Sequence, residues 1–571
     1  MGVDRSDPLD EVRQVLLRPL LFVGLFSFLG NLLLLALPLY TMQLFDRVIV
    51  SGSFETLAYL TVIALFTLAV LAAFDVLRAR LLAALGGWAE ARLAARVFNG
   101  VVAAALRGGS YQTEALRDLR SLRSFLTAGG ITPLLDAIWV PLFIGATYLL
   151  HPLLGEIALG AAVVLLALAG VGELVNRRST TATSALTAEA DRDALAVARS
   201  AEAITAMGMA DAIVRRWFAK SARAAGLSYR ASLRVGALSA LSKFLRLAVQ
   251  LALMAAGAFL VLRHELTGGA MIAASIIMGR ALAPIEQTIG GLRQMMGARL
   301  AYRHLKRHLA ASGEEGEGAM ALPAPMGAVT VEGLNFVPPG QTKPALQGVS
   351  LSLQPGEMLA VIGPAAAGKS TLARLLVGLQ RPTSGTVRLD GAEVSTWPKS
   401  ELGRYVGYLP QSLTLLPGTV GENIARFSEG GPADVVAAAR LARIHDMVLR
   451  LPRGYDTAVG EIDATLSGGQ RQRIGLARSL YGAPRFVVLD EPNSNLDGEA
   501  EASLAQTLQE LRAQGCSAVV VTHRLGLVTL ADKVLALRDG AVELYGARQI
   551  FLDRLAPRPV ATLPRAVAKE G

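Results

Sequence analysis

This 571-residue chain is poor in cysteine, aromatic residues and charge. Its single cysteine, Cys516, excludes an intrachain disulfide and a cysteine metal site. Aromatic residues make up 6% of the chain and charged residues 18%, and no basic patch is interleaved with aromatics, which argues against nucleic-acid binding despite a net charge of +10. Acidic residues near the N-terminus also exclude the basic region of a cleavable signal peptide.

Apolar residues are what the chain has in excess: 52% of it is hydrophobic, and the mean hydropathy is +0.43. A soluble globular domain is less apolar than this. The first half holds apolar stretches of about 20 residues, the length that crosses a bilayer as a helix. We place six of them, near residues 20–42, 56–77, 131–150, 153–174, 245–263 and 269–290. Only His151 and Pro152 separate the third from the fourth, so these two could instead form one hairpin or a re-entrant segment.

The segments between these stretches alternate in length and charge. Those near 43–55, 151–153 and 264–268 are short, whereas those near 78–130 and 175–244 are long and basic. Because positively charged loops face the cytoplasm, we expect six spans with both termini inside. The long segments are rich in alanine and leucine at helical spacing, so we expect them to be helical extensions that project from the membrane.

The texture of the sequence changes after the last apolar stretch. A polar segment containing glycine and proline predicts a linker, and beyond it short apolar runs alternate with helical stretches, as in an α/β domain with a partly parallel sheet. The expected parts are a short cytoplasmic segment (1–18), a transmembrane domain (19–310), the linker (311–327), an α/β domain (328–555) and a disordered tail (556–571).

A glycine-rich segment, GPAAAGKS, follows the apolar run LAVI and precedes the helical stretch TLARLLVG. A strand, such a loop and a helix in this order form a phosphate-binding loop, in which backbone N–H groups and the helix N-terminus hold phosphate oxygens. The residues expected to bind the nucleotide are Gly363, Pro364, Ala365, Ala366, Ala367, Gly368, Lys369, Ser370 and Thr371. Lys369 would neutralise phosphate charge, and Ser370, or less directly Thr371, would supply a hydroxyl to Mg²⁺. Taken alone, the segment could also be an ordinary turn before a helix.

Polar residues at the ends of further apolar runs complete a set for nucleotide hydrolysis. The run FVVL, at 486–489, predicts a buried strand that ends in Asp490 and Glu491. Asp490 would bind Mg²⁺, and Glu491 would be the general base that polarises the attacking water. His523, after SAVVVT, is placed to contact the γ-phosphate, while Gln411, in YLPQ, would contact both Mg²⁺ and the water. Without a phosphate loop upstream, the two acids would more simply be surface residues.

The motifs GPAAAGKS, YLPQ, LSGGQRQR, FVVLDE and THR occur in the order found in the nucleotide-binding domains of ABC transporters, which the chain resembles. That resemblance implies the cofactors ATP and Mg²⁺ and a homodimer, because LSGGQ closes over the ATP held by a second subunit. The residues implied at the partner's ATP are Ser467, Gly468, Gly469 and Gln470. The segment NSNLD, at 493–497, would link the two ATP sites. The implied fold is a membrane α-helical bundle of the ABC exporter type, with six transmembrane helices, and a cytoplasmic α/β P-loop ABC ATPase domain.

One position departs from the pattern of that family. ABC domains usually carry an aromatic residue, some way before the phosphate loop, that stacks on adenine. The corresponding segment here is LNFVPPG, and Pro338 occupies the usual position of the aromatic. Phe336 is the candidate that would stack on adenine instead. The alternative is that Phe336 belongs to the core, because it faces the same side of a strand as Pro338.

Phrases in the membrane half are more specific. LYTMQLFDRV (39–48), DAIWVPLFIG (136–145) and GAMIAASIIMGRALAPIEQ (269–287) are similar to type I secretion permease/ATPases of the PrtD type. This resemblance implies ATP-driven export of an unfolded protein with a C-terminal signal across the bacterial inner membrane. The implied partners are a periplasmic membrane-fusion adaptor, an outer-membrane TolC-like channel and membrane lipid, but no nucleic acid. Because only 1–18 precede the first span, we expect no protease-like leader domain.

The resemblance also implies mechanical coupling through cytoplasmic helical loops near 100–125 and 205–220. Asp118 and Arg120 are candidate contacts with the ATPase domains, and the alternative is that they are ordinary solvated charges. Arg280 lies within an apolar stretch, where a charge is costly and usually functional or paired. It is a candidate for the substrate path, with Glu286 as its candidate partner.

Two other functions stay open at this point. An exporter of lipid, drug or small peptide would use the same ATPase. A non-transporting, nucleotide-gated regulator would not need a complete hydrolytic set, so the presence of Lys369, Glu491 and His523 argues against it.

Overall fold

The computed structural model describes residues 8–106, 114–127, 129–312, 322–460, 466–494 and 497–555. It divides into two units, Met1–Gly313 and Glu314–Gly571, and the division falls within the predicted linker 311–327. The middle of that linker and the predicted tail, 556–571, lie outside the described residues. The first helix begins at Pro8, so much of the predicted N-terminal segment 1–18 is helical.

Within its described residues, the first unit is built from helices joined by short turns. The helices are α1 (Pro8–Leu33), α2 (Ala36–Gln43), the π-helix η1 (Leu44–Val48), α3 (Ile49–Ser51), α4 (Phe54–Leu106), α5 (Glu114–Thr127), α6 (Thr132–Ala137), α7 (Val140–Leu150), α8 (Pro152–Arg199), α9 (Ala201–Ala206), α10 (Ala210–Leu262), α11 (Gly268–Gly290) and α12 (Leu292–Ser312). Along the described chain, the stretches long and apolar enough to cross a membrane are Leu17–Ser51, Phe54–Leu106, Thr132–Leu150, Pro152–Ala198, Ala210–Leu262 and Gly268–Gly290. The prediction of six spans is therefore confirmed.

The short sequence between the third and fourth spans separates two helices. His151 has an extended backbone, with φ of −165°, which ends α7. Its ring Nδ1 accepts a hydrogen bond from the backbone N–H of Leu153 at 3.2 Å and so caps α8. Pro152 occupies the first turn of α8, where its missing N–H leaves no helical hydrogen bond unmade.

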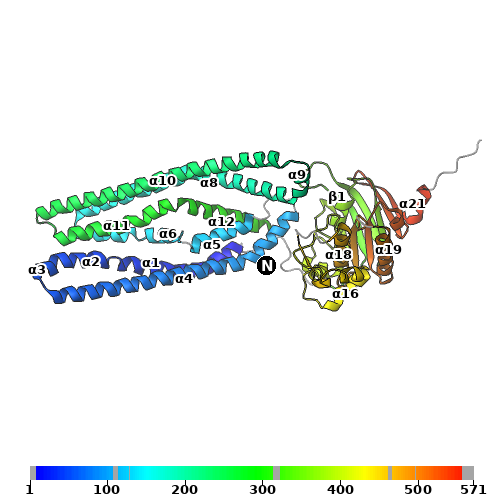
Figure 1. Ribbon diagram of the computed structural model, residues 1–571, viewed down its shortest axis with the longest axis horizontal. Helices are drawn as coiled ribbons and strands as arrows, with labels where there is room; N and C mark the ends of the chain where they lie inside the picture. Colours follow the sequence, from blue (N-terminus) through cyan, green and yellow to red (C-terminus); the bar gives the residue numbers. More distant parts are fainter. Residues whose placement is uncertain are drawn as a thin grey trace, which may run out of the picture. The chain divides into compact units, whose positions relative to one another are not determined.

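Three helices of the first unit are much longer than a bilayer requires. Helices α4, α8 and α10 have 53, 48 and 53 residues. At 1.5 Å per residue they extend about 70–80 Å, against a hydrocarbon core of about 30 Å. Figure 1 shows them as long rods, with α8 packed along α10 and α4 along α1. The predicted helical extensions of the spans are therefore present.

The second unit contains two main sheets. Its strands are β1 (Val329–Phe336), β2 (Leu346–Leu353), β3 (Met358–Ile362), β4 (Ser384–Leu389), β5 (Ala392–Glu393), β6 (Val406–Leu409), β7 (Gly418–Thr419), β8 (Ala458–Val459), β9 (Phe486–Asp490), β10 (Ser517–Val521), β11 (Lys533–Arg538) and β12 (Ala541–Ala547). One sheet has the order β2-β1-β4-β5 and is antiparallel. The other has the order β12-β11-β3-β10-β9-β6, and only its β11–β12 pair is antiparallel. The predicted partly parallel sheet is therefore present.

The helices of the second unit surround these sheets. They are α13 (Lys369–Leu376), α14 (Lys399–Tyr405), α15 (Val420–Ile424), α16 (Pro432–Leu441), α17 (His445–Leu449), the 3-10 helix η2 (Gly454–Asp456), α18 (Gly468–Leu480), α19 (Gly498–Ala513), α20 (Leu525–Val528) and α21 (Arg548–Leu555). One apolar core gathers α15, α16, α18 and α19 against the parallel sheet, and a second fills the space between the two sheets around α13.

The parallel strands determine where the polar motifs meet. Strand β10 lies between β3 and β9, and β6 pairs with the other side of β9. The carboxyl ends of parallel strands share one edge of the sheet, which is where open α/β sheets bind their ligands. The phosphate loop, Glu491, His523 and Gln411 follow β3, β9, β10 and β6, so all four reach the same edge.

Candidate functional site

The glycine-rich loop joins β3 to α13 through backbone that only glycine adopts easily. Gly363 has φ of 149°, and a Cβ there would lie 2.2 Å from the carbonyl oxygen of Leu537. Gly368 has φ of 96°, and a Cβ there would lie 2.6 Å from the carbonyl oxygen of Ala345. The loop therefore passes too close to its neighbours for any side chain at these two positions. It leads directly into the N-terminus of α13, where Lys369, Ser370 and Thr371 form the first turn.

Lys369 is held inside this loop. Its side chain donates hydrogen bonds to the carbonyl oxygens of Gly363 at 2.9 Å and Pro364 at 2.8 Å. The residue is only 6% exposed. Burial lowers the pKa of Lys369 below its ordinary value, while the nearby Glu491 and Asp490 carboxylates act in the opposite direction. The ammonium group is thus positioned among the groups that are predicted to hold phosphate.

Asp490, at the end of β9, is 2% exposed. Burial raises the pKa of Asp490 above its ordinary value, and a hydrogen bond with the Ser370 hydroxyl opposes that rise. Its Oδ1 is buried and has no hydrogen-bond partner among the described residues. A buried carboxylate oxygen without a partner is costly unless a cation binds it. Asp490 and Ser370 therefore fit a Mg²⁺ site, and their role as its ligands stays a prediction.

The composition of the site also fits this metal. The described part of the chain contains no group of three or more histidine, cysteine, aspartate or glutamate side chains suited to hold an ion by themselves. Mg²⁺ is usually bound by one or two protein oxygens together with water and phosphate. The Asp490–Ser370 pair agrees with that mode of binding and not with an all-protein metal cage.

Glu491 connects two of the other predicted residues. Its Oε2 accepts a hydrogen bond from Gln411 Nε2 at 2.9 Å, and its Oε1 lies 3.2 Å from His523 Nε2. The Glu491 side chain is 24% exposed, so it remains accessible to water. The structure thus brings Gln411, Glu491 and His523 together at the sheet edge, although they come from three separate motifs. A carboxylate with these two neighbours can accept a proton from water.

The LSGGQ segment forms the start of α18. Ser467 is the N-cap: its Oγ accepts a hydrogen bond from Gln470 N at 3.2 Å. In return, the Gln470 side chain accepts a hydrogen bond from Ser467 N at 2.8 Å, which completes a capping box. Gly468 and Gly469 occupy the first turn of the helix. The segment therefore presents a helix N-terminus, which favours anions, and Gln470 has a structural task that the sequence did not reveal.

The prediction that Phe336 stacks on adenine is wrong. Phe336 is only 6% exposed and belongs to the apolar core between the two sheets. It pairs with Leu346 of β2, so its side chain is committed to the interior. A ring that stacks on a base needs an open face. The alternation of β1 places Phe336 inward, as the alternative interpretation expected.

Two residues to which the sequence did not point form hydrogen bonds with Glu491 or with the residues that follow it. Gln472, on α18, donates hydrogen bonds through Nε2 to the Glu491 carbonyl oxygen and to Ser494 Oγ, both at 3.0 Å. Thr522, between β10 and His523, contacts Asn493 through its hydroxyl at 3.3 Å. For Gln472, the only signal was its proximity to LSGGQ. The segment NSNLD (493–497), which was expected to link the two ATP sites, is described except for residues 495 and 496.

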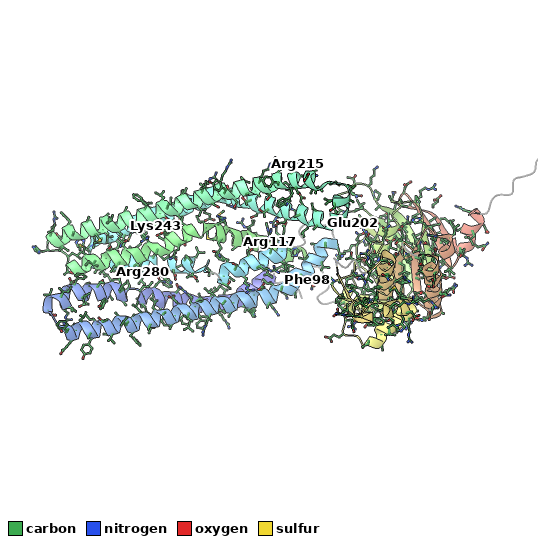
Figure 2. The ribbon with its side chains drawn as sticks, in the orientation of Figure 1. Phe98, Arg117, Glu202, Arg215, Lys243 and Arg280 are labelled. Atoms are coloured by element: carbon green, nitrogen blue, oxygen red, sulfur yellow. The ribbon has the colours of Figure 1, made fainter. Side chains whose placement is uncertain are left out.

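In the membrane unit, the predicted partner of Arg280 is wrong. Glu286 accepts a hydrogen bond from Arg246 of α10 at 2.5 Å. Arg280 lies on α11, as Figure 2 shows, and is exposed.

Asp118 contacts His304 of α12 at 3.1 Å. Burial raises the pKa of Asp118 above its ordinary value, and His304 opposes that rise.

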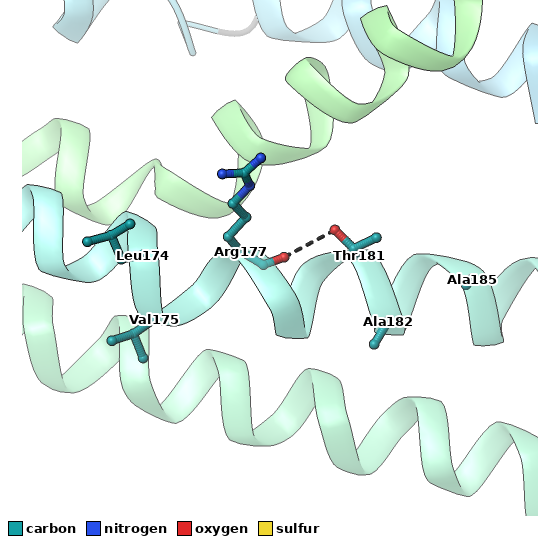
Figure 3. A pocket seen from close by; sticks show the side chains of 6 residues that line it. All are labelled: Leu174, Val175, Arg177, Thr181, Ala182 and Ala185. Atoms are coloured by element: carbon teal, nitrogen blue, oxygen red, sulfur yellow. Dashed lines mark hydrogen bonds between the residues drawn. The ribbon is translucent and has the colours of Figure 1, made fainter. Parts of the chain in front are cut away.

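An open hollow of about 850 Å³ lies along α8. Its lining residues are Leu174, Val175, Arg177, Thr181, Ala182 and Ala185 (Figure 3). The Thr181 hydroxyl donates a hydrogen bond to the Arg177 carbonyl oxygen at 3.1 Å, an ordinary bond within a helix. The hollow has none of the predicted nucleotide residues, so it is separate from the chemistry at the sheet edge.

Comparison with known proteins agrees with both halves of the chain. The family described as "ABC transporter transmembrane region" matches residues 20–282, and the family described as "ABC transporter" matches residues 346–494. The type I secretion system ATP-binding protein PrsD of Rhizobium meliloti (strain 1021) is 39% identical over 548 residues, which cover 94% of this chain and 93% of PrsD.

More distant relatives have the same domain pair. The cyclolysin secretion/processing ATP-binding protein CyaB of Bordetella pertussis is 29% identical over 93% of this chain and 75% of its own length. A solved structure of a bacterial Atm1-family ABC exporter with ATP bound covers 95% of this chain and 97% of its own, with a TM-score of 0.83 and 24% identity. At that identity the likeness concerns the fold.

Proposed function

Because this chain belongs to the ABC transporters, and among them to the type I secretion ATP-binding proteins, we propose that it exports an unfolded protein across the bacterial inner membrane by hydrolysing ATP. The observation that carries the ATPase part is the meeting of Lys369, Asp490 and the Gln411–Glu491–His523 group at one sheet edge. The 39% identity to PrsD over nearly the whole chain supports a protein as the cargo.

The residues at the sheet edge divide the work of hydrolysis. The backbone N–H groups of the phosphate loop and Lys369 bind phosphate. Ser370 and Asp490 would hold Mg²⁺, which would supply positive charge to the phosphates. Glu491 orients the attacking water and accepts its proton, while Gln411 and His523 hold the carboxylate in place through the bonds at its two oxygens.

We also propose that the active form is a homodimer. The N-terminus of α18, with Ser467, Gly468 and Gly469, would bind the ATP held by a second copy of this chain. In support, Ser467 is exposed although it begins a largely buried helix. The adaptor, the outer-membrane channel and a cargo with a C-terminal signal belong to the same proposal, as does a role for Asp118 and Arg120 in coupling.

The ATPase assignment is tested by Glu491→Gln in the full chain, purified into nanodiscs. Loss of the general base should lower the ATPase kcat at least 100-fold, since general-base catalysis contributes about 10²–10⁴-fold. ATP binding should persist, and the closed dimer should accumulate. Glu510→Gln is the matched control, because Glu510 is exposed on α19 and pairs with the exposed Arg443 at 3.6 Å. Undiminished turnover in Glu491→Gln would contradict the assignment.

The cargo assignment is tested in the bacterium that carries this chain. A strain without the gene is complemented with the wild-type chain, with Glu491→Gln or with Glu510→Gln, and the secreted proteins are compared. We expect at least one protein to disappear from the medium with Glu491→Gln and to be present with the other two. An identical set of secreted proteins in all strains, under conditions where the chain is made, would refute protein export.

Arg280 supports a polar path through the membrane unit. It is exposed on α11 and makes no hydrogen bond or ion pair with the described residues, while Met278 and Leu282 beside it are fully buried. One and two turns further, the same face carries the half-buried Ala283 and the exposed Gln287. A charge facing lipid would be costly. We therefore propose that this face of α11 meets water and cargo.

Cysteine labelling tests this path. Burial raises the pKa of the Cys516 thiol to about 12, so the native chain should not react with a charged, membrane-impermeant thiol reagent. Arg280→Cys should react rapidly, because a thiolate forms only where water reaches it. Leu251→Cys is the control, since Leu251 is 69% exposed on an apolar face of α10. Equal, slow labelling at both positions would place Arg280 against lipid or a second subunit.

A further inference from the structure

The backbone of Glu491 adopts an unfavourable conformation. Its φ is +53°, in the left-handed region that residues other than glycine rarely enter. Such a conformation persists only where neighbouring groups hold it, and it is often found at functional sites. With this backbone conformation, the carboxylate of Glu491 lies within reach of Gln411 at 2.9 Å and His523 at 3.2 Å.

Three hydrogen bonds hold the Glu491 backbone. Its N–H donates to the carbonyl oxygen of Val521 at 3.0 Å, which ties it to β10. Its carbonyl oxygen accepts from Ser494 N at 3.1 Å and from Gln472 Nε2 at 3.0 Å. The first two bonds come from the sheet and from the turn itself. The Gln472 bond is the one of the three that comes from a side chain, and it comes from a helix, α18.

The Gln472 side chain is buried beside the Glu491 peptide. It is 8% exposed, and its Nε2 uses both hydrogens, one for Glu491 O and one for Ser494 Oγ. Its Oε1 is buried and accepts no hydrogen bond from the described residues. A buried amide with an unsatisfied oxygen costs stability. The side chain therefore contributes through its donors rather than through burial of its surface.

We propose that Gln472 is the positioning residue for the general base: its amide holds the strained Glu491 peptide so that the carboxylate faces the nucleotide. Gln472 lies on α18, the helix whose N-cap is Ser467 of the LSGGQ segment. In the proposed dimer, the N-terminus of α18 contacts the ATP of the partner subunit. The Gln472 side chain therefore joins α18 to Glu491, the general base for the ATP that its own subunit binds. This inference rests on the proposed ATPase function and extends it to communication between the two sites.

The test replaces Gln472 with methionine in the full chain, in nanodiscs. Methionine has nearly the same length and volume, fits an apolar interior and cannot donate the two hydrogen bonds. We expect kcat for ATP hydrolysis to fall about tenfold, the equivalent of one well-placed hydrogen bond. The KM for ATP and the amount of bound nucleotide per chain should change less than about twofold, because the phosphate loop is untouched.

Thr507→Val is the matched control. Thr507 is fully buried on α19, and its hydroxyl shares its one hydrogen between the Leu441 and Ser503 carbonyl oxygens at 2.9 and 3.0 Å, away from the nucleotide residues. Valine keeps its shape and removes the hydrogen bond, so it reports the effect of a lost buried hydrogen bond on stability alone. We expect Thr507→Val to lower the melting temperature and leave kcat unchanged. Gln472→Met should lower kcat and retain bound nucleotide, with a change in melting temperature no larger than that of Thr507→Val.

The outcomes separate this inference from the function on which it rests. If the wild-type chain does not hydrolyse ATP, the proposed function fails. If the wild type is active and Gln472→Met keeps the wild-type kcat, the positioning role is wrong while the ATPase stands. A parallel loss of kcat, bound nucleotide and melting temperature would show that Gln472 only stabilises the fold, and would also overturn the inference.

Discussion

A group of polar side chains inside the membrane unit provides a quantitative test of the structure. Oδ1 of Asp136, on α6, accepts hydrogen bonds from Ser27 Oγ at 2.7 Å, Asn31 Nδ2 at 3.1 Å and Arg78 Nη1 at 2.8 Å. These residues come from α1 and α4, so one carboxylate joins three helices. Ser27 and Asn31 are 0% and 4% exposed, and the Arg78 and Asp136 side chains are 16% and 18% exposed.

Asp136→Ala should destabilise the protein by about 3 kcal/mol. Two bonds from neutral donors to the carboxylate at about 1.5 kcal/mol each, and one bond from the Arg78 cation at about 2 kcal/mol, give an upper estimate of about 5 kcal/mol. The loss is smaller because two partners keep other bonds: Asn31 donates to the Ser27 carbonyl oxygen at 2.8 Å, and Arg78 contacts Asp75 at 3.1 Å. Asp136→Asn keeps an acceptor and loses the charge, so it should cost only about 1 kcal/mol.

A double-mutant cycle isolates the ion pair. Arg78→Met leaves the Asp136 carboxylate without its cation and should cost about 2 kcal/mol. Combining it with Asp136→Ala should cost about 3 kcal/mol rather than the sum of about 5 kcal/mol, which corresponds to a coupling energy of about 2 kcal/mol. Asp75→Asn is the control: Asp75 is 56% exposed, and an exposed pair contributes less than about 1 kcal/mol.

Unfolding by SDS in mixed micelles, followed by far-UV circular dichroism, measures these differences because the membrane unit supplies most of the helical signal. A destabilisation by Asp136→Ala no larger than that of Asp75→Asn would refute the reasoning. A coupling energy near zero, with both single variants destabilised, would show that Arg78 and Asp136 act independently and that the pair is not formed.

Three further predictions concern the ATPase unit. Because burial raises the pKa of Asp490, ionisation of this carboxyl destabilises the fold as pH rises through that raised pKa. Asp490→Asn should therefore raise the melting temperature of the nucleotide-free protein at pH 7.5. The same variant should abolish the additional stabilisation by Mg²⁺ with ATP, and thermal unfolding measures both effects. Lys369→Ala should weaken ATP binding about 10- to 100-fold, measured with a fluorescent ATP analogue, since one or two charge-assisted bonds are lost. Gly368→Ala should abolish nucleotide binding, because its Cβ would lie 2.6 Å from the Ala345 carbonyl oxygen; wild-type affinity would contradict the observed loop.

Motifs with strict local requirements were predictable from the sequence. The phosphate loop and the acidic pair depend on residues adjacent in the chain, and the structure places each at the expected strand or helix end. The six spans were predictable because length and hydropathy alone decide whether a helix can cross a bilayer. The long helical extensions followed from composition and spacing.

Pairings between distant segments were not predictable in the same way. Glu286 was expected to pair with Arg280 on its own helix, whereas packing of α11 against α10 brings Arg246 to it. Phe336 was a candidate for adenine stacking, but the pairing of β1 with β2 turns its ring into the core. In both cases a second element, far away in the chain, decides which partner is within reach.

By itself, the sequence determined the six apolar spans and the phosphate loop, and it predicted a Mg²⁺ ligand and a general base, each encoded by neighbouring residues. Only the tertiary structure decided how these parts act together, because hydrogen bonds work over about 3 Å. Strand order brings Gln411 and His523 to opposite oxygens of Glu491. The packing of α18 brings the Gln472 side chain to the Glu491 carbonyl oxygen, and so joins the helix that begins with LSGGQ to Glu491.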